Sequence, residues 1–341
     1  MTKSRFEIAA IMDDLRDLYI GTASFAALQD HLQQLFRVGE DGELTHEPIL
    51  FTAGTEAHGV ILIAGPGTGK TTDLVHVLRD FEALAENPDT GMPRYIRVSV
   101  ESPATLRSLA CQFLEELGID RVSERTKVHE LWAMVRKLLK RRGITLVVVD
   151  EAHDMFRGAS ATEADAMFRM MKSLMKGDHP VALILAGTER LRAITRLDGQ
   201  VNRRFSKIIV PPLDVATDGD NVRAMIGFYA DGAGLAVSLR DDVALRLIHG
   251  SRCRFGRCVE TTIAAVKQAL DAGSDTLTAE HFEMAWGMAE GCPLTANVFA
   301  VDDFMAIELE DDDEIGERMQ EAHAKRAKAI PKSQRGKKKA A

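Results

Sequence analysis

Five short apolar runs alternate with amphipathic patterns through the middle of the chain. The runs are almost continuously apolar and rich in valine, isoleucine and leucine, which is typical of strands that are buried on both faces of a parallel sheet. The segments between the runs repeat apolar residues at the helical period. This alternation predicts an α/β core with a parallel sheet. The expected strands are Val60–Ala64, Tyr95–Val100, Thr145–Asp150, Val181–Ala186 and Lys207–Val210, and the helices between them begin near Lys70, Ala104, Lys127, Glu163 and Arg190.

The pattern differs on the two sides of this core. The first part of the chain shows two helical patterns followed by a polar stretch. After Thr217 the apolar runs stop, and several amphipathic helices with glycine-containing ends follow, which predicts a small helical lid. We therefore expect an N-terminal helical extension at residues 1–50, the α/β core at 51–214, the lid at 215–290, and a partly disordered tail at 291–341 that is first acidic and then basic.

Composition narrows the class of protein. The chain has 341 residues and a net charge of −8, so it can bury a large core and carries no general cationic surface for nucleic acid. Its four cysteines form no Cys-x-x-Cys pair, which favours free thiols in a reducing compartment. The N-terminal stretch contains acidic residues, and no long uncharged apolar segment follows. We expect a cytoplasmic protein with no membrane partner.

The first core strand runs into a glycine-rich loop that matches the pattern Gly-x4-Gly-Lys-Ser/Thr, except that Ala64 occupies the first position. A strand before the loop and a helix after it form the context that a phosphate-binding loop requires. Glycines let backbone N–H groups point at phosphate oxygens, and the helix N-terminus adds partial positive charge. We predict that Lys70 contacts the β- and γ-phosphates of ATP and that the Thr71 hydroxyl binds Mg²⁺. The predicted nucleotide-binding residues are Gly65, Pro66, Gly67, Thr68, Gly69, Lys70, Thr71 and Thr72.

The third core strand ends in two carboxylates. The stretch GITLVVVDEAH places Asp150 and Glu151 at the carboxyl edge of the sheet, where ligands bind in such folds. Asp150 is placed to hold Mg²⁺ through water. Glu151 is placed to orient and deprotonate the attacking water, which is a role that a hydrolase needs. Together with the phosphate-binding loop, this strand end predicts ATP hydrolysis.

Three further residues are candidates for the same site. Thr188 follows the fourth strand, where it can position the attacking water, cap the next helix, or do both. Arg203 and Arg204 precede the fifth strand, and we select Arg204 as an arginine that reaches the γ-phosphate of a neighbouring subunit; a surface pair with local acids is the alternative. In the lid we select Arg257 as a nucleotide contact.

With these residues in view, the chain resembles an AAA+ ATPase. The phosphate loop, the VVVDE strand end, the polar residue after the fourth strand, the RRF arginines and a helical lid occur in that family's order from about Ala53 to Glu290. The resemblance implies a three-layer P-loop fold with a five-stranded sheet of order 5-1-4-3-2, a helical lid, and a homo-oligomer in the form of a ring or filament with ATP between subunits.

A narrower resemblance is to the TniB/TnsC group of transposition ATPases. It rests on VVVDEAHDM, on LILAGTERLRAITRLDGQVNRRFSKIIVPPLD, and on the entry segment YIGTASFAALQDHLQQLF. The resemblance implies a protein that polymerises with ATP on duplex DNA, without sequence preference, and recruits or activates a transposase, with a target-selecting protein as a further partner. It also implies DNA contacts after the second strand, where Arg121, Arg125 and Lys127 stand; a solvated loop is the alternative for them.

Two other functions fit the same core. An IstB-like helicase loader or an initiator-type AAA+ ATPase shares the motifs, and copurification with a transposase distinguishes it from a transposition regulator. A signalling ATPase that binds protein in place of DNA is the second alternative, which salt-dependent binding to random duplex DNA tests.

Overall fold

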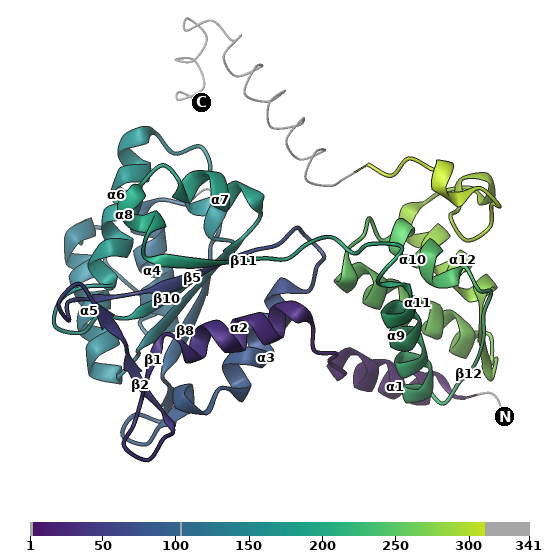
Figure 1. Cartoon of the computed structure of the whole chain (residues 1–341), viewed down its shortest axis with the longest axis horizontal. Coiled ribbons are helices and arrows are strands. Elements are labelled where there is room, and N and C mark those ends of the chain that lie inside the picture. Colours follow the sequence, from purple (N-terminus) through teal and green to yellow (C-terminus); the bar gives the residue numbers. More distant parts are fainter. Residues whose placement is uncertain (1–2, 103, 311–341) are drawn as a thin grey trace, which may run out of the picture. The chain divides into compact units, whose positions relative to one another are not determined.

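The computed structural model describes residues 3–102 and 104–310, which divide into two compact units (Figure 1). The core unit contains residues 20–211. The helical unit contains the described residues of 1–19 and of 212–341. The expected N-terminal extension is thus divided, because helix α1 (Arg5–Asp17) packs on helices of the helical unit, whereas α2 (Ala23–Gln33) packs on the core.

A five-stranded parallel sheet forms the centre of the core unit. The strand order is β11-β5-β10-β9-β8, which is 5-1-4-3-2 when these strands are numbered along the chain, so the expected order is confirmed. All neighbouring strands pair in parallel. The carboxyl ends of all five strands therefore lie at one edge of the sheet. The strands are β5 (Gly59–Ile63), β8 (Tyr95–Ser99), β9 (Leu146–Asp150), β10 (Ala182–Gly187) and β11 (Phe205–Ile209).

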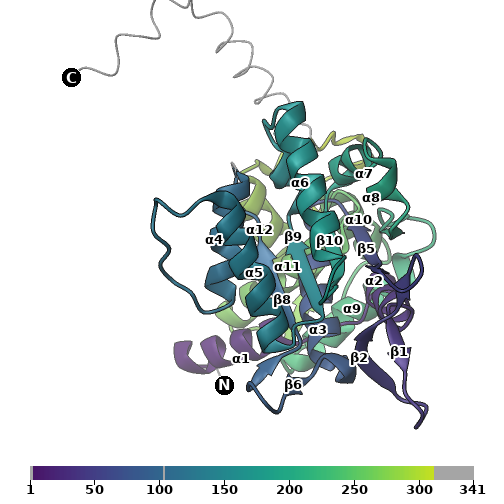
Figure 2. The same cartoon turned by 90° about the vertical axis from the view of Figure 1, so that its left-hand side faces the viewer.

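Successive residues of the strands alternate between two hydrophobic layers. On β5, Ile61 and Ile63 join the layer that α4, α5 and α6 cover, whereas Val60 and Leu62 join the layer that α2 and α3 cover. Figure 2 shows α4, α5 and α6 in front of the strands. Burial on both faces explains why the strands read as continuous apolar runs. These helices are α3 (Lys70–Asp80), α4 (Leu106–Glu116), α5 (Val128–Arg142) and α6 (Ala161–Leu174).

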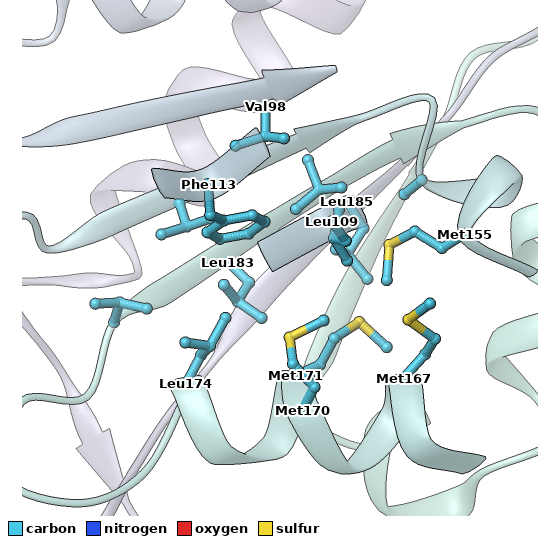
Figure 3. Packing of buried hydrophobic residues seen from close by; sticks show 14 of the residues in the cluster. Val98, Leu109, Phe113, Met155, Met167, Met170, Met171, Leu174, Leu183 and Leu185 are labelled. Carbon is cyan, nitrogen blue, oxygen red and sulfur yellow. The ribbon is translucent and has the colours of Figure 1, made fainter. Parts of the chain in front are cut away.

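Helix α6 packs its methionines into the core. Met167, Met170 and Met171 are buried and point from α6 toward the sheet, where Leu183 and Leu185 of β10 lie (Figure 3). Flexible thioether side chains fill irregular space between a helix and a sheet. The short elements at the carboxyl edge are η2 (Ala152–Phe156), α7 (Glu189–Thr195) and α8 (Gly199–Asn202).

A small hairpin precedes the sheet where the sequence pattern indicates only a polar loop. Its strands are antiparallel, and Gly42 between them has a φ of 85°, which glycine adopts without strain. The dipeptide Asp41-Gly42 is a hairpin signal that the reading of this stretch as loop overlooked. The short elements of the core unit are β1 (Phe36–Val38), β2 (Leu44–Pro48), β3 (Leu50–Phe51), β4 (Glu56–Ala57), η1 (Glu82–Leu84), β6 (Glu86–Asn87) and β7 (Met92–Pro93).

The helical unit contains the expected amphipathic helices and also a short parallel strand pair, β12 with β13. Part of the expected tail belongs to this unit, because Val298 and Phe299 are buried and the buried Arg246 donates hydrogen bonds to the carbonyls of Val298 and Val301. Residues 311–341, which include the basic part of the tail, lie outside the described residues. The elements are α9 (Gly219–Gly232), β12 (Ala236–Ser238), α10 (Val243–Gly250), α11 (Phe255–Asp271), β13 (Thr276–Thr278), α12 (Ala279–Glu290), η3 (Leu294–Ala296) and η4 (Phe304–Ala306).

Candidate nucleotide site

The glycine-rich loop lies between β5 and α3, as the sequence predicts. Gly67 and Gly69 have φ values of 72° and 94°, a backbone conformation that favours glycine. The Thr68 hydroxyl donates to the Gly65 carbonyl at 2.9 Å and closes the loop. Gly69 is the N-cap of α3, and no side chain caps this helix. The N-terminal amides of α3 are therefore directed at the position where a phosphate would bind.

Two polar contacts join the loop to the end of β9. The Lys70 ammonium lies 3.0 Å from Oε1 of Glu151, and the Thr71 hydroxyl donates to Oδ2 of Asp150 at 3.0 Å. Lys70 and Asp150 are buried, whereas the Glu151 side chain is 38% exposed. The predicted phosphate-binding lysine, magnesium-binding hydroxyl and both carboxylates thus meet at one point of the sheet edge.

Glu151 is held in an uncommon conformation. Its φ of 51° lies in the left-handed region, which is rare for residues other than glycine and occurs often at functional sites. Its backbone N–H donates to Oδ1 of Asp150 at 2.9 Å. Its second carboxylate oxygen, Oε2, lies 3.3 Å from Nδ1 of His153. The two oxygens of Glu151 therefore face Lys70 and His153, respectively.

His153 is a neighbour of the site that the sequence did not assign to it. Burial lowers the pKa of His153, while the nearby carboxylates of Asp154 and Glu151 act in the opposite direction. The imidazole packs against Gly187 at the end of β10, where an added Cβ would approach Nδ1 to 3.0 Å. A signal existed in the sequence, since His153 follows the carboxylate pair within the same DEAH stretch.

Thr188 lies beside this cluster, directly after β10, and is buried. It occupies the N-cap position of α7, but its side chain does not cap that helix. The Thr188 hydroxyl has no hydrogen-bond partner within residues 3–102 and 104–310. A buried hydroxyl without a partner is costly, so this one is suited to a ligand at the sheet edge.

Arg204 does not occupy the exposed position that action on a neighbouring subunit requires. It lies before β11 at the opposite, amino edge of the sheet, and it is 2% exposed. Its guanidinium contacts Oε2 of Glu56 at 2.9 and 3.0 Å and donates to the Gln200 carbonyl at 3.0 Å. This arrangement corrects the selection of Arg204, because breaking a buried ion pair is costly. The adjacent Arg203 side chain is 62% exposed.

A buried carboxylate on the helix of the phosphate loop is a second feature that the sequence did not reveal. Asp73 of α3 is 1% exposed and accepts hydrogen bonds from the hydroxyls of Thr22 and Ser24. Thr22 also caps α2 by accepting from the Phe25 N–H. The contact ties the entry segment to the helix that begins at Lys70.

The remaining predicted residues lie away from the loop. Arg121, Arg125 and Lys127 are exposed in the segment that joins α4 to α5, and Arg107 steadies this segment by donating to the carbonyls of Ser123 and Thr126. Arg257 lies on α11 in the helical unit. The roles of these residues remain predictions.

The residues present fit a nucleoside triphosphate with Mg²⁺. Uncapped amides, a buried lysine, a Thr71–Asp150 pair, an adjacent glutamate and an unpartnered hydroxyl converge at the carboxyl edge of the sheet. This site, on a parallel sheet of order 5-1-4-3-2, defines a P-loop protein with the AAA+ fold.

The chain belongs to the bacterial TniB family, whose family model matches residues 16–214. A comparison with curated protein sequences gives no match. The solved structures that resemble the chain include the Orc1 protein of Aeropyrum pernix in complex with DNA (20% identity, 84% of this chain and 72% of that chain covered, TM-score 0.57). The chain is also similar to the ORC2 protein of the same organism, with 15% identity, 86% of this chain and 73% of that chain covered, and a TM-score of 0.57. It is similar to Cdc6p of Pyrobaculum aerophilum as well, with 14% identity, 87% of this chain and 76% of that chain covered, and a TM-score of 0.53. At these identities the likeness concerns the fold.

Within the part of the chain that the structure describes, no helix has the length and apolar character needed to cross a membrane.

Proposed function

We propose that this protein is an ATP- and Mg²⁺-dependent ATPase that assembles on duplex DNA and regulates DNA transposition by recruiting or activating a transposase. The observation that carries the ATPase part is the pair of contacts, Lys70 with Glu151 and Thr71 with Asp150, that joins the phosphate loop to the strand end. Membership of the TniB family supports the role in transposition.

The arrangement of Lys70 and Glu151 suggests how binding prepares hydrolysis. Without nucleotide, the ammonium of Lys70 neutralises the Glu151 carboxylate. A phosphate bound in the loop attracts Lys70, which frees Oε1 of Glu151 to accept a proton from water. Thr188 donates its unpartnered hydroxyl to hold that water or a phosphate oxygen. Thr71 and Asp150 would hold Mg²⁺, which neutralises charge on the phosphates when it is bound.

In an oligomer, an arginine from the adjacent subunit would complete the site. Arg203 is the residue of the RRF stretch that is free to do so, because its side chain is exposed and its contact with Glu56 is long, at 3.7 Å. Arg204 keeps the adjacent backbone in place through its buried pair with Glu56. A guanidinium stabilises the charge that develops on the transferred phosphoryl group. Arg257 is proposed as the nucleotide contact from the helical unit.

DNA binding is supported by the exposed cations of the α4–α5 segment, namely Arg121, Arg125 and Lys127. It is also supported by the similar Orc1 protein, whose structure contains DNA. Contacts to phosphates are independent of sequence and weaken as salt rises. Binding to random duplex DNA should therefore fall with salt, and the double variant Arg121→Glu/Arg125→Glu should bind less with a shallower salt dependence.

Electron microscopy of the purified protein with duplex DNA and a slowly hydrolysed ATP analogue tests the assembly directly. We expect rings or filaments on DNA that require the analogue. A protein that binds ATP but remains monomeric on DNA would contradict the proposed assembly. Copurification with a transposase tests the partner.

An initiator-type or helicase-loading ATPase is the second candidate, favoured by the likeness to Orc1 and Cdc6p. Retention of a replicative helicase, in place of a transposase, on an affinity-tagged chain would support it.

A further inference from the structure

A groove runs between α5 and α6 on the face of the core unit that these helices cover (Figure 2). Its basic part has a volume of about 710 Å³, and its apolar part has a volume of about 490 Å³. Arg136 and Ser173 line both parts and are joined by a hydrogen bond of 3.3 Å, so the two parts are continuous. His179 in the basic part contacts the Ile144 carbonyl at 2.7 Å, just before β9, which places this part at the amino edge of the sheet. We call the two parts together the α5–α6 groove.

The sequence of α5 sets the order of chemistry along the α5–α6 groove. Side chains four positions apart form a ridge along a helix, and four residues with this spacing line the groove. They are Val128, Trp132, Arg136 and Lys140. The ridge is therefore apolar at the start of α5 and cationic at its end. Its twelve positions span about 18 Å, which an extended peptide of about five or six residues covers.

The basic part of the groove carries an excess of positive charge. One carboxylate, that of Asp178, and four cationic side chains line it, namely those of Arg136, Lys137, Lys140 and Lys176. Lys137 and Lys140 are exposed and form no ion pair within the described part of the chain. Lys176 contacts Glu56, but this glutamate is already paired with a buried arginine. The C-terminal dipoles of α5 and α6 supply about half a negative charge each, which leaves part of the excess uncompensated. The basic part is therefore suited to an anionic ligand.

The apolar part of the groove differs in charge and in exposure. Its cation Arg169 is paired with Asp165. Val128 is 36% exposed although it is a large apolar residue. Trp132 is 5% exposed, and its indole N–H donates to the Leu106 carbonyl at 3.1 Å, so this donor is already used. A ligand in the apolar part therefore gains chiefly by covering apolar surface.

A ligand that fits both parts has apolar groups at one end and negative charge at the other. A nucleic-acid backbone carries its charge evenly along its length, so it matches only the basic part. A protein segment with apolar residues next to acidic ones matches both. We propose that the α5–α6 groove is the docking site for a short linear segment of a partner protein, apolar at the end that contacts Val128 and acidic at the end that contacts Lys140. Docking at this groove does not depend on nucleotide hydrolysis.

Fluorescence anisotropy with a synthetic peptide tests this docking on the full chain. The probe has a leucine-rich half and a glutamate-rich half, and it is prepared in both orders. We expect saturable binding of at least one order, and this binding should weaken as salt rises. Lys137→Glu/Lys140→Glu should lower the affinity by at least about tenfold, because two attractive charges become repulsive. Equal binding to the native chain and to this variant would overturn the proposal, as would no binding of either order.

A second comparison tests the apolar part of the groove. Val128→Ser removes exposed apolar surface at the start of α5, so the affinity for the probe should fall by about threefold. A probe whose leucines are replaced by serine should bind the native chain and Val128→Ser equally, because it has no apolar contact to lose. Equal effects of Val128→Ser on the two probes would show that charge alone holds the peptide, which would overturn the apolar half of the proposal.

Three controls separate this docking from other events. Arg121→Glu/Arg125→Glu reverses two charges elsewhere on the core unit and should leave probe binding unchanged. Circular dichroism of Lys137→Glu/Lys140→Glu checks its fold, so the test stands whether or not the chain hydrolyses ATP. Random duplex DNA should bind this variant as it binds the native chain. A loss of DNA binding without a loss of probe binding would assign the groove to nucleic acid and overturn the proposal.

Discussion

The two edges of the core sheet use the same residue types for opposite purposes. At the carboxyl edge, Lys70 contacts a glutamate whose side chain is 38% exposed. At the amino edge, Arg204 contacts a glutamate whose side chain is 3% exposed. Under the proposed function, Lys70 of the first pair exchanges its partner for a phosphate, whereas the second pair is enclosed by the protein and also contacted by Lys176. We therefore propose a functional role for the ion pair with the more exposed glutamate and a structural role for the enclosed pair.

The largest expected effect at the carboxyl edge comes from Lys70→Ala. The phosphate charge loses its buried cationic partner, so we expect ATP affinity to fall by at least about a hundredfold, which corresponds to a buried charge-assisted contact. Calorimetric titration with ATP and Mg²⁺ measures this. Lys137→Ala, which removes an exposed lysine of the same unit, is the matched control. Unchanged ATP binding by folded Lys70→Ala would refute the nucleotide site.

Glu151→Gln separates binding from chemistry at the same edge. The amide keeps the size of the side chain but cannot accept the proton of water, so hydrolysis should slow by about a hundredfold to a thousandfold while ATP is still bound. Phosphate release and ATP titration measure the two properties. An assembly trapped with ATP should follow on DNA. Normal turnover by this variant would show that another residue is the base.

The sequence predicted which residues meet at the carboxyl edge, whereas it did not predict the buried ion pair at the amino edge. Asp150 and Glu151 follow a continuous apolar strand, and Lys70 follows a glycine-rich loop. The residues next to each of them in the sequence are therefore enough to predict its position at the sheet edge. Arg204 looked like an exposed arginine because its partner Glu56 lies 148 residues away in the sequence. The position of α1 on the helical unit was missed for the same physical reason, since its contacts come from helices that follow residue 212. Local patterns do not report such distant partners.

At the amino edge, the variants Arg204→Ala and Arg203→Ala test which of the two arginines stabilises the fold. Removing Arg204 leaves Glu56 buried without its main partner, so the free energy of unfolding should fall by about 3–5 kcal/mol. Arg203→Ala should leave stability nearly unchanged, because its side chain is exposed. Urea unfolding of the two variants measures the difference. Similar stabilities would remove the structural role assigned to Arg204.

The same two variants test which arginine acts between subunits. Arg203→Ala should bind ATP normally and hydrolyse it slowly. Mixing it with Lys70→Ala subunits, which offer Arg203 but cannot bind ATP, should restore part of the activity. Activity that is not recovered on mixing would exclude action of Arg203 on a neighbour.

Acid should reduce the stability that the Glu56–Arg204 ion pair contributes at the amino edge, and it should do so in a defined pH range. Hydrogen bonds from Arg204, and then from Lys176, lower the pKa of Glu56 from 4.5 to about 2. Because the folded-state pKa is the lower one, the pair contributes stability above pH 4.5 and loses it as pH falls from 4.5 toward 2. Urea midpoints measured across this window should fall less steeply in Glu56→Gln than in the native chain. Parallel curves would contradict the assignment.

The smallest expected effect concerns His153, the neighbour of Glu151 at the carboxyl edge. Its Nδ1 lies 3.3 Å from Oε2 of Glu151 without forming a hydrogen bond, and burial lowers the pKa of His153. His153→Ala removes the imidazole that packs beside Oε2, so the carboxylate of Glu151 is held less firmly and kcat should fall by about threefold to tenfold. His153→Gln, which keeps a polar side chain of similar size at this position, should recover part of the loss. KM for ATP should stay constant in both variants, because the phosphate contacts of Lys70 are intact. A rise in KM without a change in kcat would mean that His153 supports the loop and not the base.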